Sequence, residues 1–208
     1  MQMKQMAIPA RNSGLNLFDA NFVKLCILLS LKGKFPNNCH HSPLYEQTNY
    51  FSMGVHMFKK VQKVPVSLDT AWDFFSHPKN LSVMTPSYLN LKLTNPLFGD
   101  EMYAGQVITY NVKPILGIPM FWMTEITHVQ PKLFFVDEQR FGPYALWHHQ
   151  HHFREIEGGV EMTDLIHYKA PLGPLGNIAN ALFIRSQLEG IFRFRFSKVE
   201  ELFGKWEQ

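Results

Sequence analysis

The chain has little cysteine, little charge and no long apolar run. Only Cys26 and Cys39 occur among its 208 residues, and no cysteine follows them. A disulfide framework, a thiolate zinc site and a cysteine nucleophile are therefore excluded from the main part of the chain. The longest apolar run, 22–31, is interrupted by Lys24 and Ser30, and it is far shorter than the ~20 residues of a membrane span. No integral membrane segment is expected.

The charge balance argues against a nucleic-acid partner. Charged residues make up 18% of the chain, below the ~25% of an average soluble domain. Lysine and arginine exceed the acidic residues by 20 to 17, and a net charge of +3 is too small for a nucleic-acid-binding surface. The 46% hydrophobic content favours a folded globular domain, and because no cleavage site follows the apolar run, a cytoplasmic location is expected.

Several catalytic signatures are also missing. The chain has no Gly-rich phosphate loop, no Gly-x-Ser-x-Gly elbow and no His-Glu-x-x-His motif. These absences remove the usual signs of nucleotide hydrolysis and of serine or zincin protease chemistry, and no cofactor is expected.

The pattern of the chain changes near residue 53. Residues 1–52 show no sustained periodicity, apart from a possible short helix at 19–31, and they carry the whole +3 charge excess. We interpret them as an extension outside the fold, or as sequence translated from an upstream start. A targeting or partner-binding arm is the alternative. Residues 53–208 are expected to form one domain.

The second part of the chain predicts an α+β fold. A strand at 61–66 precedes a helix that Ser67 would cap and that runs to Phe75, followed by a short helix at 78–84. Alternating polarity and turn residues then predict six strands at 88–94, 105–113, 117–129, 132–140, 145–157 and 160–169. A long amphipathic helix is expected at 177–203, with an apolar stripe of Ile178, Leu182, Leu188, Ile191, Phe192, Val199, Leu202 and Phe203. An antiparallel sheet folded around this helix would bury both apolar faces.

The Gly158-Gly159 pair predicts a two-residue hairpin turn, which would set Glu157 opposite Val160. The alternation of the two strands then divides their residues between two faces. The solvent face would include His148 and His152. The interior face would hold Trp147, His149, His151, Phe153, Val160, Met162, Asp164, Ile166 and Tyr168.

A second turn at 130–131 would place Val129 opposite Lys132. One face of these two strands would then be interior, like the interior face described above. It would hold Trp122, Thr124, Ile126, Phe135, Asp137 and Gln139.

The aromatic interior therefore contains four polar side chains that would need partners. If the loop that contains Gly142 and Pro143 has three residues, Asp137 would lie opposite His149; a loop of four residues would reverse the faces. Asp164 would lie diagonally near His151 and could be its partner. Three interpretations of this group stay open. The pairs could only satisfy one another, they could anchor a ligand, or they could serve proton transfer or bind a metal. The His149-x-His151 spacing allows a metal with an aspartate as third ligand, but no motif fixes three ligands, so no metal is expected.

Two sets of motifs carry a resemblance to a known family, over about 57–203. The first set is Val64-Pro-Val, Ala71-Trp-Asp-Phe-Phe and Pro78-Lys-Asn-Leu. It resembles the opening of START-like, or SRPBCC (polyketide cyclase/dehydrase and lipid transport), superfamily proteins. The second set is Trp122-x-x-Glu-Ile, Phe135-Val-Asp-Glu-Gln, Gly142-Pro-Tyr, Trp147-His-His-Gln-His-His-Phe and Pro171-Leu-Gly-Pro-Leu-Gly. It is similar to the bacterial ligand-binding subgroup of that superfamily.

This resemblance implies a helix-grip fold, in which a curved seven-stranded antiparallel sheet surrounds the C-terminal helix and encloses a hydrophobic cavity. It does not imply one activity, because the superfamily includes lipid carriers, hormone receptors, cyclases and hydroxylase subunits. We expect a carrier or sensor of a small hydrophobic molecule, lipid or polyketide-like, and not an enzyme. A cofactor-independent cyclase or dehydratase and a protein-interaction module are the alternatives. The expected cavity residues are Tyr110, Trp122, Thr124, Phe135, Asp137, Gln139, Trp147, His149, His151, Phe153, Asp164, Tyr168 and Leu182. Of these, the polar group Asp137, His149, His151 and Asp164 supplies the catalytic candidates.

Overall fold

The computed structural model describes residues 54–96, 99, 101–115 and 117–207. The extension expected at 1–52, its possible helix and both cysteines lie outside the described residues.

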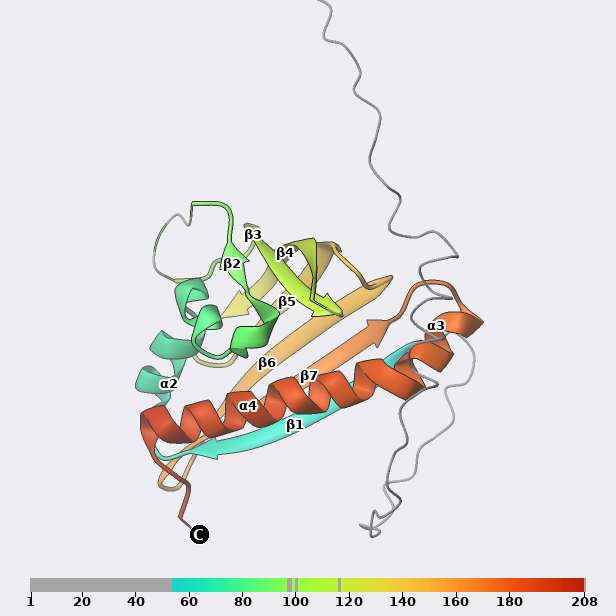
Figure 1. The fold of residues 1–208 in the computed structure, drawn as a ribbon. Coiled ribbons are helices and arrows are strands. Elements are labelled where there is room, and N and C mark those ends of the chain that lie inside the picture. The colour runs from blue at the N-terminus through green and yellow to red at the C-terminus, as the bar shows by residue number, and fades with distance from the viewer. Residues whose placement is uncertain (1–53, 97–98, 100, 116, 208) are drawn as a thin grey trace, which may run out of the picture. The chain divides into compact units, whose positions relative to one another are not determined.

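Seven strands form one antiparallel sheet in the order β1-β7-β6-β5-β4-β3-β2 (Figure 1). Each strand pairs antiparallel with its neighbour, as the sequence predicted. The strands are β1 (His56–Val64), β2 (Lys92–Leu93), β3 (Gln106–Ile115), β4 (Ile118–Gln130), β5 (Phe134–Phe141), β6 (Leu146–Ile156) and β7 (Gly159–Lys169). The strand predicted at 88–94 is largely wrong, because a 3-10 helix, η2 (Ser87–Leu89), takes up its first part and only β2 remains extended.

Two short helices follow β1, as expected. The helix α2 (Leu68–Phe75) begins at Ser67, whose hydroxyl accepts a hydrogen bond from the Thr70 amide at 3.2 Å and so satisfies a free N–H of the first turn. The 3-10 helix η1 (Pro78–Ser82) comes next. The C-terminal helical run consists of α3 (Pro174–Ala179), the π-helical turn η3 (Asn180–Ile184) and α4 (Arg185–Phe203).

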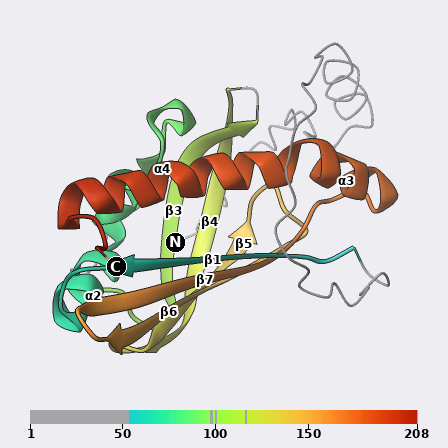
Figure 2. The ribbon, with the colours of Figure 1, turned by 90° about the horizontal axis from the view of Figure 1, so that it is seen from below.

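The helix α4 lies across one face of the sheet (Figures 1 and 2) and buries Leu188, Phe192 and Val199 against it. The predicted apolar stripe is wrong at three other positions, since Ile178, Leu182 and Leu202 are 48%, 53% and 43% exposed. The π turn follows Ile178 and contains Leu182: its i→i+5 hydrogen bonds, in place of i→i+4, shift the phase of these two residues relative to α4. None of the helices in the described part of the chain has the length and apolar character needed to cross a bilayer.

The hairpin between β6 and β7 turns one residue earlier than predicted. Glu157 and Gly158 form the turn, Gly158 with φ of +82°, and Ile156 pairs with Gly159. The predicted pairing of Glu157 with Val160 is therefore wrong by two residues, and His151 lies opposite Asp164. Gly159 belongs to β7 and not to the turn, and it lies against β1: a Cβ at Gly159 would be 2.1 Å from the carbonyl oxygen of Val64. A shift of two residues leaves every side chain on its predicted face.

The register between β4 and β5 also differs from the prediction while the faces stay the same. Val129 pairs with Phe135 and not with Lys132, because the connection spans three residues. A bulge between Ile126 and His128 restores the alternation, so that Ile126 pairs with Asp137. Across the next pair of strands, Asp137 lies directly opposite His149, as expected.

Candidate functional site: a buried histidine–aspartate cluster

Three neighbouring strands bring four polar side chains together, and we name this group the His–Asp cluster. Asp137 comes from β5, His149 and His151 from β6, and Asp164 from β7. Their spacing of two along β6 and their direct pairing across the strands place them on the interior face. Both histidines are 6% exposed and Asp164 is 4% exposed, whereas the Asp137 side chain is 17% exposed.

Each imidazole of the cluster contacts both carboxylates. His149 places Nε2 3.0 Å from Asp164 Oδ1 and Nδ1 3.3 Å from Asp137 Oδ2. His151 places Nε2 2.9 Å from Asp137 Oδ2 and Nδ1 2.9 Å from Asp164 Oδ1, although this last contact lacks hydrogen-bond geometry. The two pairs expected from the sequence, Asp137 with His149 and Asp164 with His151, are both present, and each carboxylate also reaches the other ring.

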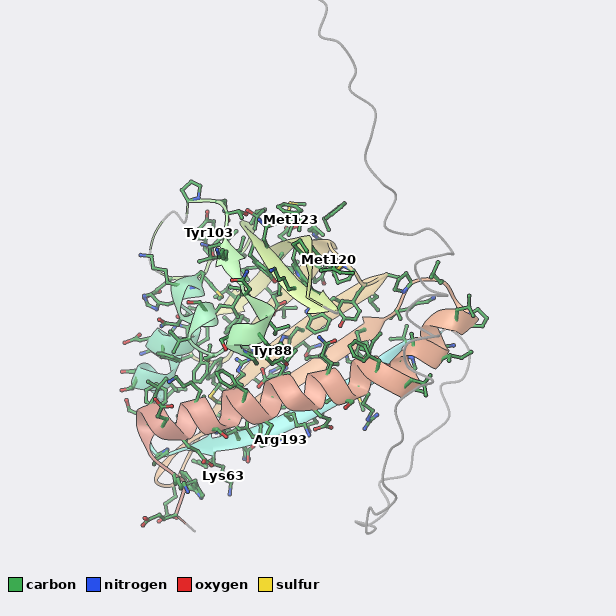
Figure 3. The ribbon with its side chains drawn as sticks, in the orientation of Figure 1. Lys63, Tyr88, Tyr103, Met120, Met123 and Arg193 are labelled. Carbon is green, nitrogen blue, oxygen red and sulfur yellow. The ribbon has the colours of Figure 1, made fainter. Side chains whose placement is uncertain are left out.

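Arg195 adds a positive charge from α4. Its Nη1 lies 3.6 Å from Asp164 Oδ1, and its side chain is 11% exposed. The guanidinium also lies 5.6 Å from the ring centre of Phe192 and 5.7 Å from that of Phe75. Arg193 on the same helix is exposed (labelled in Figure 3). The spacing of three between Arg195 and the buried Phe192 is the sequence signal that places Arg195 toward the interior.

The charges of the cluster shift the ionisation of its members. Burial opposes ionisation of Asp137, but the facing imidazoles outweigh burial and hold the pKa of this carboxyl well below its usual range. The same balance, with the charge of Arg195 added, lowers the pKa of Asp164. Burial acts to lower the pKa of His149, and the two carboxylates overcome it and raise that pKa. Both aspartates are therefore ionised at neutral pH.

Aromatic rings enclose the cluster. The two imidazoles lie 3.8 Å apart between ring centres, and Phe135 stacks on His151 at 4.2 Å. Trp147 and Phe192 meet the His149 ring edge-on at 6.0 and 6.2 Å. Figure 3 shows side chains occupying the space between α4 and the sheet. The surroundings of the cluster are thus apolar, which strengthens its internal charge interactions.

A second, uncharged polar group lies on β3 and β4. Thr124 Oγ1 accepts a hydrogen bond from the indole N–H of Trp122 at 3.0 Å and lies 3.0 Å from the Tyr110 hydroxyl. All three residues are buried, and burial raises the pKa of Tyr110. These three predicted cavity residues are therefore interior and satisfy one another.

The other predicted cavity residues divide between the core and the loop after β5. Phe153 packs edge-on against Trp72, and the Tyr168 hydroxyl donates a hydrogen bond to Asn180 Oδ1 at 2.7 Å. Gln139 bonds both the backbone N–H and the carbonyl of Tyr144, so it braces the loop and offers no free group to a ligand.

Two further predictions concern residues at the edge of the interior. Trp147 is half-buried and donates its indole N–H to Asp137 Oδ1 at 3.3 Å. The prediction for Leu182 is wrong: this side chain is 53% exposed because the π turn directs Asn180, not Leu182, toward the sheet.

The neighbouring histidines of β6 belong to the opposite face. His148 Nδ1 lies 2.8 Å from Glu138 Oε1, and His152 Nε2 lies 2.9 Å from Gln150 Oε1. Both are half-buried, which is less exposed than predicted; the rings of His167 and Phe134 on adjacent strands lie 6.3 Å from His148 and 5.7 Å from His152, respectively. The run of four histidines thus consists of an inner and an outer pair, as the alternation predicted.

Solved structures show the same fold. The chain superposes on ginseng major latex-like protein 151 from Panax ginseng with a TM-score of 0.54 at 13% identity, over 72% of this chain and 98% of that one. Protein CV1439 from Chromobacterium violaceum gives 0.54 at 8% identity over 72% and 98%, and TTHA0849 from Thermus thermophilus gives 0.52 at 12% identity over 71% and 99%. No protein-family model and no curated protein sequence matches the chain. The fold is therefore a helix-grip fold.

Proposed function

We propose that the protein binds a small hydrophobic molecule, lipid or polyketide-like, between the sheet and α4. The observation that carries this proposal is the His–Asp cluster, which is buried within an aromatic interior. A core that served stability alone would be as stable or more stable with apolar side chains at these positions. Ligand sites, by contrast, combine an apolar lining with a few convergent polar groups.

The exposure of the two carboxylates indicates from which side a ligand would reach the cluster. The Asp137 side chain is 17% exposed and that of Asp164 is 6% exposed. A polar group of the ligand would therefore approach beside Asp137 and compete with it for the N–H groups of the imidazoles. The ligand's apolar body would lie against Trp147 and Trp122, whose rings meet edge-on at 5.5 Å.

Probe binding tests this proposal. We expect His149→Phe and His151→Phe to weaken binding of fluorescent apolar compounds with a polar head by roughly twofold to tenfold, the effect of one lost hydrogen bond of about 0.5–1.5 kcal/mol. Purely aliphatic probes should bind as before. His148→Phe changes the same residue type on the opposite face and is the matched control. Unchanged affinity for every probe in both inner-pair variants would contradict the proposal, and native mass spectrometry of protein from its source would identify a bound molecule.

A cofactor-independent cyclase or dehydratase is the second candidate, and one observation favours it. His149 lies between two carboxylates, which outweigh the effect of burial and raise its pKa, and this favours a role as a proton donor to a substrate oxygen. Mass spectrometric detection of cyclised or dehydrated product from a linear polyketone would support this candidate. Product formation that survives His149→Phe would exclude this role for His149.

A further inference from the structure

The four ring nitrogens of His149 and His151 lie 2.9 to 3.3 Å from carboxylate oxygens, although the contact of His151 Nδ1 lacks hydrogen-bond geometry. A neutral imidazole carries one N–H and one lone pair. Two neutral rings would therefore place lone pairs beside negatively charged oxygens inside an apolar surrounding. Positive charge between the rings and the carboxylates, as additional protons or as one divalent cation, would relieve this repulsion.

Three of the facing atoms are placed as ligands of a single ion. Asp137 Oδ2 lies 2.9 Å from His151 Nε2 and 3.3 Å from His149 Nδ1, and the donor atoms that these three residues can offer lie within 4.8 Å of one another. Ligand atoms bound to zinc at about 2.0–2.1 Å are roughly 3.0–3.4 Å apart in octahedral or tetrahedral geometry. We propose that Asp137, His149 and His151 bind one divalent transition-metal ion, with zinc as the best-matched metal.

The atoms behind the three ligands support this assignment. The indole N–H of Trp147 donates to Asp137 Oδ1 at 3.3 Å, which leaves Oδ2 for the ion. His149 Nε2 donates to Asp164 Oδ1 at 3.0 Å, which fixes the tautomer whose Nδ1 lone pair faces Asp137. Carboxylates behind metal-bound histidines set ring orientation and ligand basicity in this way. Asp164 is thus a positioning residue, and Arg195 Nη1 lies 3.6 Å from the same oxygen, Oδ1.

The chemistry of the donor set points to the class of metal. Two imidazole nitrogens and one carboxylate oxygen suit zinc and its first-row neighbours better than calcium or magnesium, which prefer oxygen ligands. Three protein ligands also leave a coordination position open for water or for an oxygen of a bound molecule. The sequence led to an expectation of no metal because the third ligand was undetermined; the pairing of Asp137 with His149 supplies it. The metal site does not depend on the proposed ligand binding.

Zinc loading of the untagged, full-length protein tests the site. The protein is stripped with a chelator, incubated with zinc chloride, separated from free zinc and analysed for elemental content. We expect about one zinc ion per chain and a higher unfolding temperature in the loaded protein. Asp137→Asn, which keeps an oxygen for the Trp147 indole, and His149→Gln should each abolish stoichiometric zinc, and Asp164→Asn should weaken zinc affinity by about 10–100-fold.

His148→Gln is the matched control, because His148 is on the same strand with its side chain on the opposite face. This variant should keep its zinc. Substoichiometric zinc in the wild type, zinc retained by both ligand variants, or equal loss in the control would each overturn the site. If the ligand variants fail to fold by circular dichroism, the X-ray absorption spectrum of the loaded wild type decides: two imidazole ligands support the site, and sulfur ligands or a shell without imidazole overturn it.

Discussion

Replacing His149 by phenylalanine tests whether the His–Asp cluster is a network of coupled charges. The substitution removes a ring that lies 3.0 Å from Asp164 Oδ1 and 3.3 Å from Asp137 Oδ2, at a position that is 6% exposed. Breaking a buried ion pair by deleting one partner costs about 3–5 kcal/mol, because the remaining charge is left without compensation. For a domain of this size we expect the unfolding temperature to fall by roughly 6–20 °C.

The assay is thermal and denaturant unfolding in the presence of a chelator, so that metal binding does not contribute. The matched control is His148→Phe, whose partner Glu138 lies near the surface, and we expect a loss of about 0–1 kcal/mol there. The double variant His149→Phe/Asp137→Leu should recover much of the single variant's loss, because Asp164 keeps His151 and Arg195 as partners.

Two results would refute this reasoning. If His149→Phe destabilises the protein no more than the His148→Phe control, the buried contacts carry no net coupling. If the effects of the two substitutions in the double variant simply add, His149 and Asp137 do not interact energetically, despite their 3.3 Å contact.

Three further predictions concern pH, a glycine and the chain's first part. In metal-free protein, Asp137 and Asp164 have lowered pKa values, so their ionisation stabilises the fold above the ordinary aspartate pKa of 3.8, and this stabilisation is lost as the pH falls. His149 has a raised pKa, so its protonation stabilises the fold below the ordinary histidine pKa of 6.5, and this stabilisation is lost as the pH rises. Unfolding measured across pH should thus show greatest stability between about pH 4 and 6.5, and a flat profile would contradict the charge assignment. Gly159→Ala should destabilise the protein, because the added Cβ would lie 2.1 Å from the Val64 carbonyl oxygen. The control is Gly190→Ala, whose added Cβ would meet no atom within 4 Å, and this variant should be neutral or stabilising. Equal melting temperatures of the two variants would contradict this prediction. A chain limited to 53–208 should unfold cooperatively with an unchanged midpoint, and loss of cooperativity would show that the first part contributes to the fold.

The faces of the sheet could be predicted from the sequence even where the strand register could not. The turn between β6 and β7 is displaced, and the resulting error is two residues, so Asp164 keeps its face and lies directly opposite His151 and not diagonally from it. In β4, the bulge after Ile126 compensates for a longer turn, and Asp137 again keeps its predicted face. Alternation has a period of two, so it determines which side chains are interior but leaves the partner of each one undetermined by multiples of two.

The sequence patterns of the strands could not predict that Arg195 of α4 joins the His–Asp cluster. Arg195 comes from α4, and its contact with Asp164 depends on how α4, which follows the π turn at Asn180–Ile184, is rotated over the sheet. A π turn leaves no simple pattern in the sequence, and the same turn moved Leu182 out of the interior.

The balance of charge in the His–Asp cluster follows from this arrangement and bears on both proposals, ligand binding and metal binding. Two carboxylates face two imidazoles and one guanidinium, from four different elements. One divalent ion carries the same charge as the two protons that the imidazoles would otherwise need, so the site can exchange protons for a metal without leaving a net uncompensated charge in the apolar interior. A cluster of this kind is preorganised for a cation whether or not a hydrophobic ligand is bound. The proposed cation site and the proposed ligand contacts therefore both involve the inner pair, His149 and His151, and the outer pair lies on the opposite face of the sheet with Glu138 and Gln150 as partners.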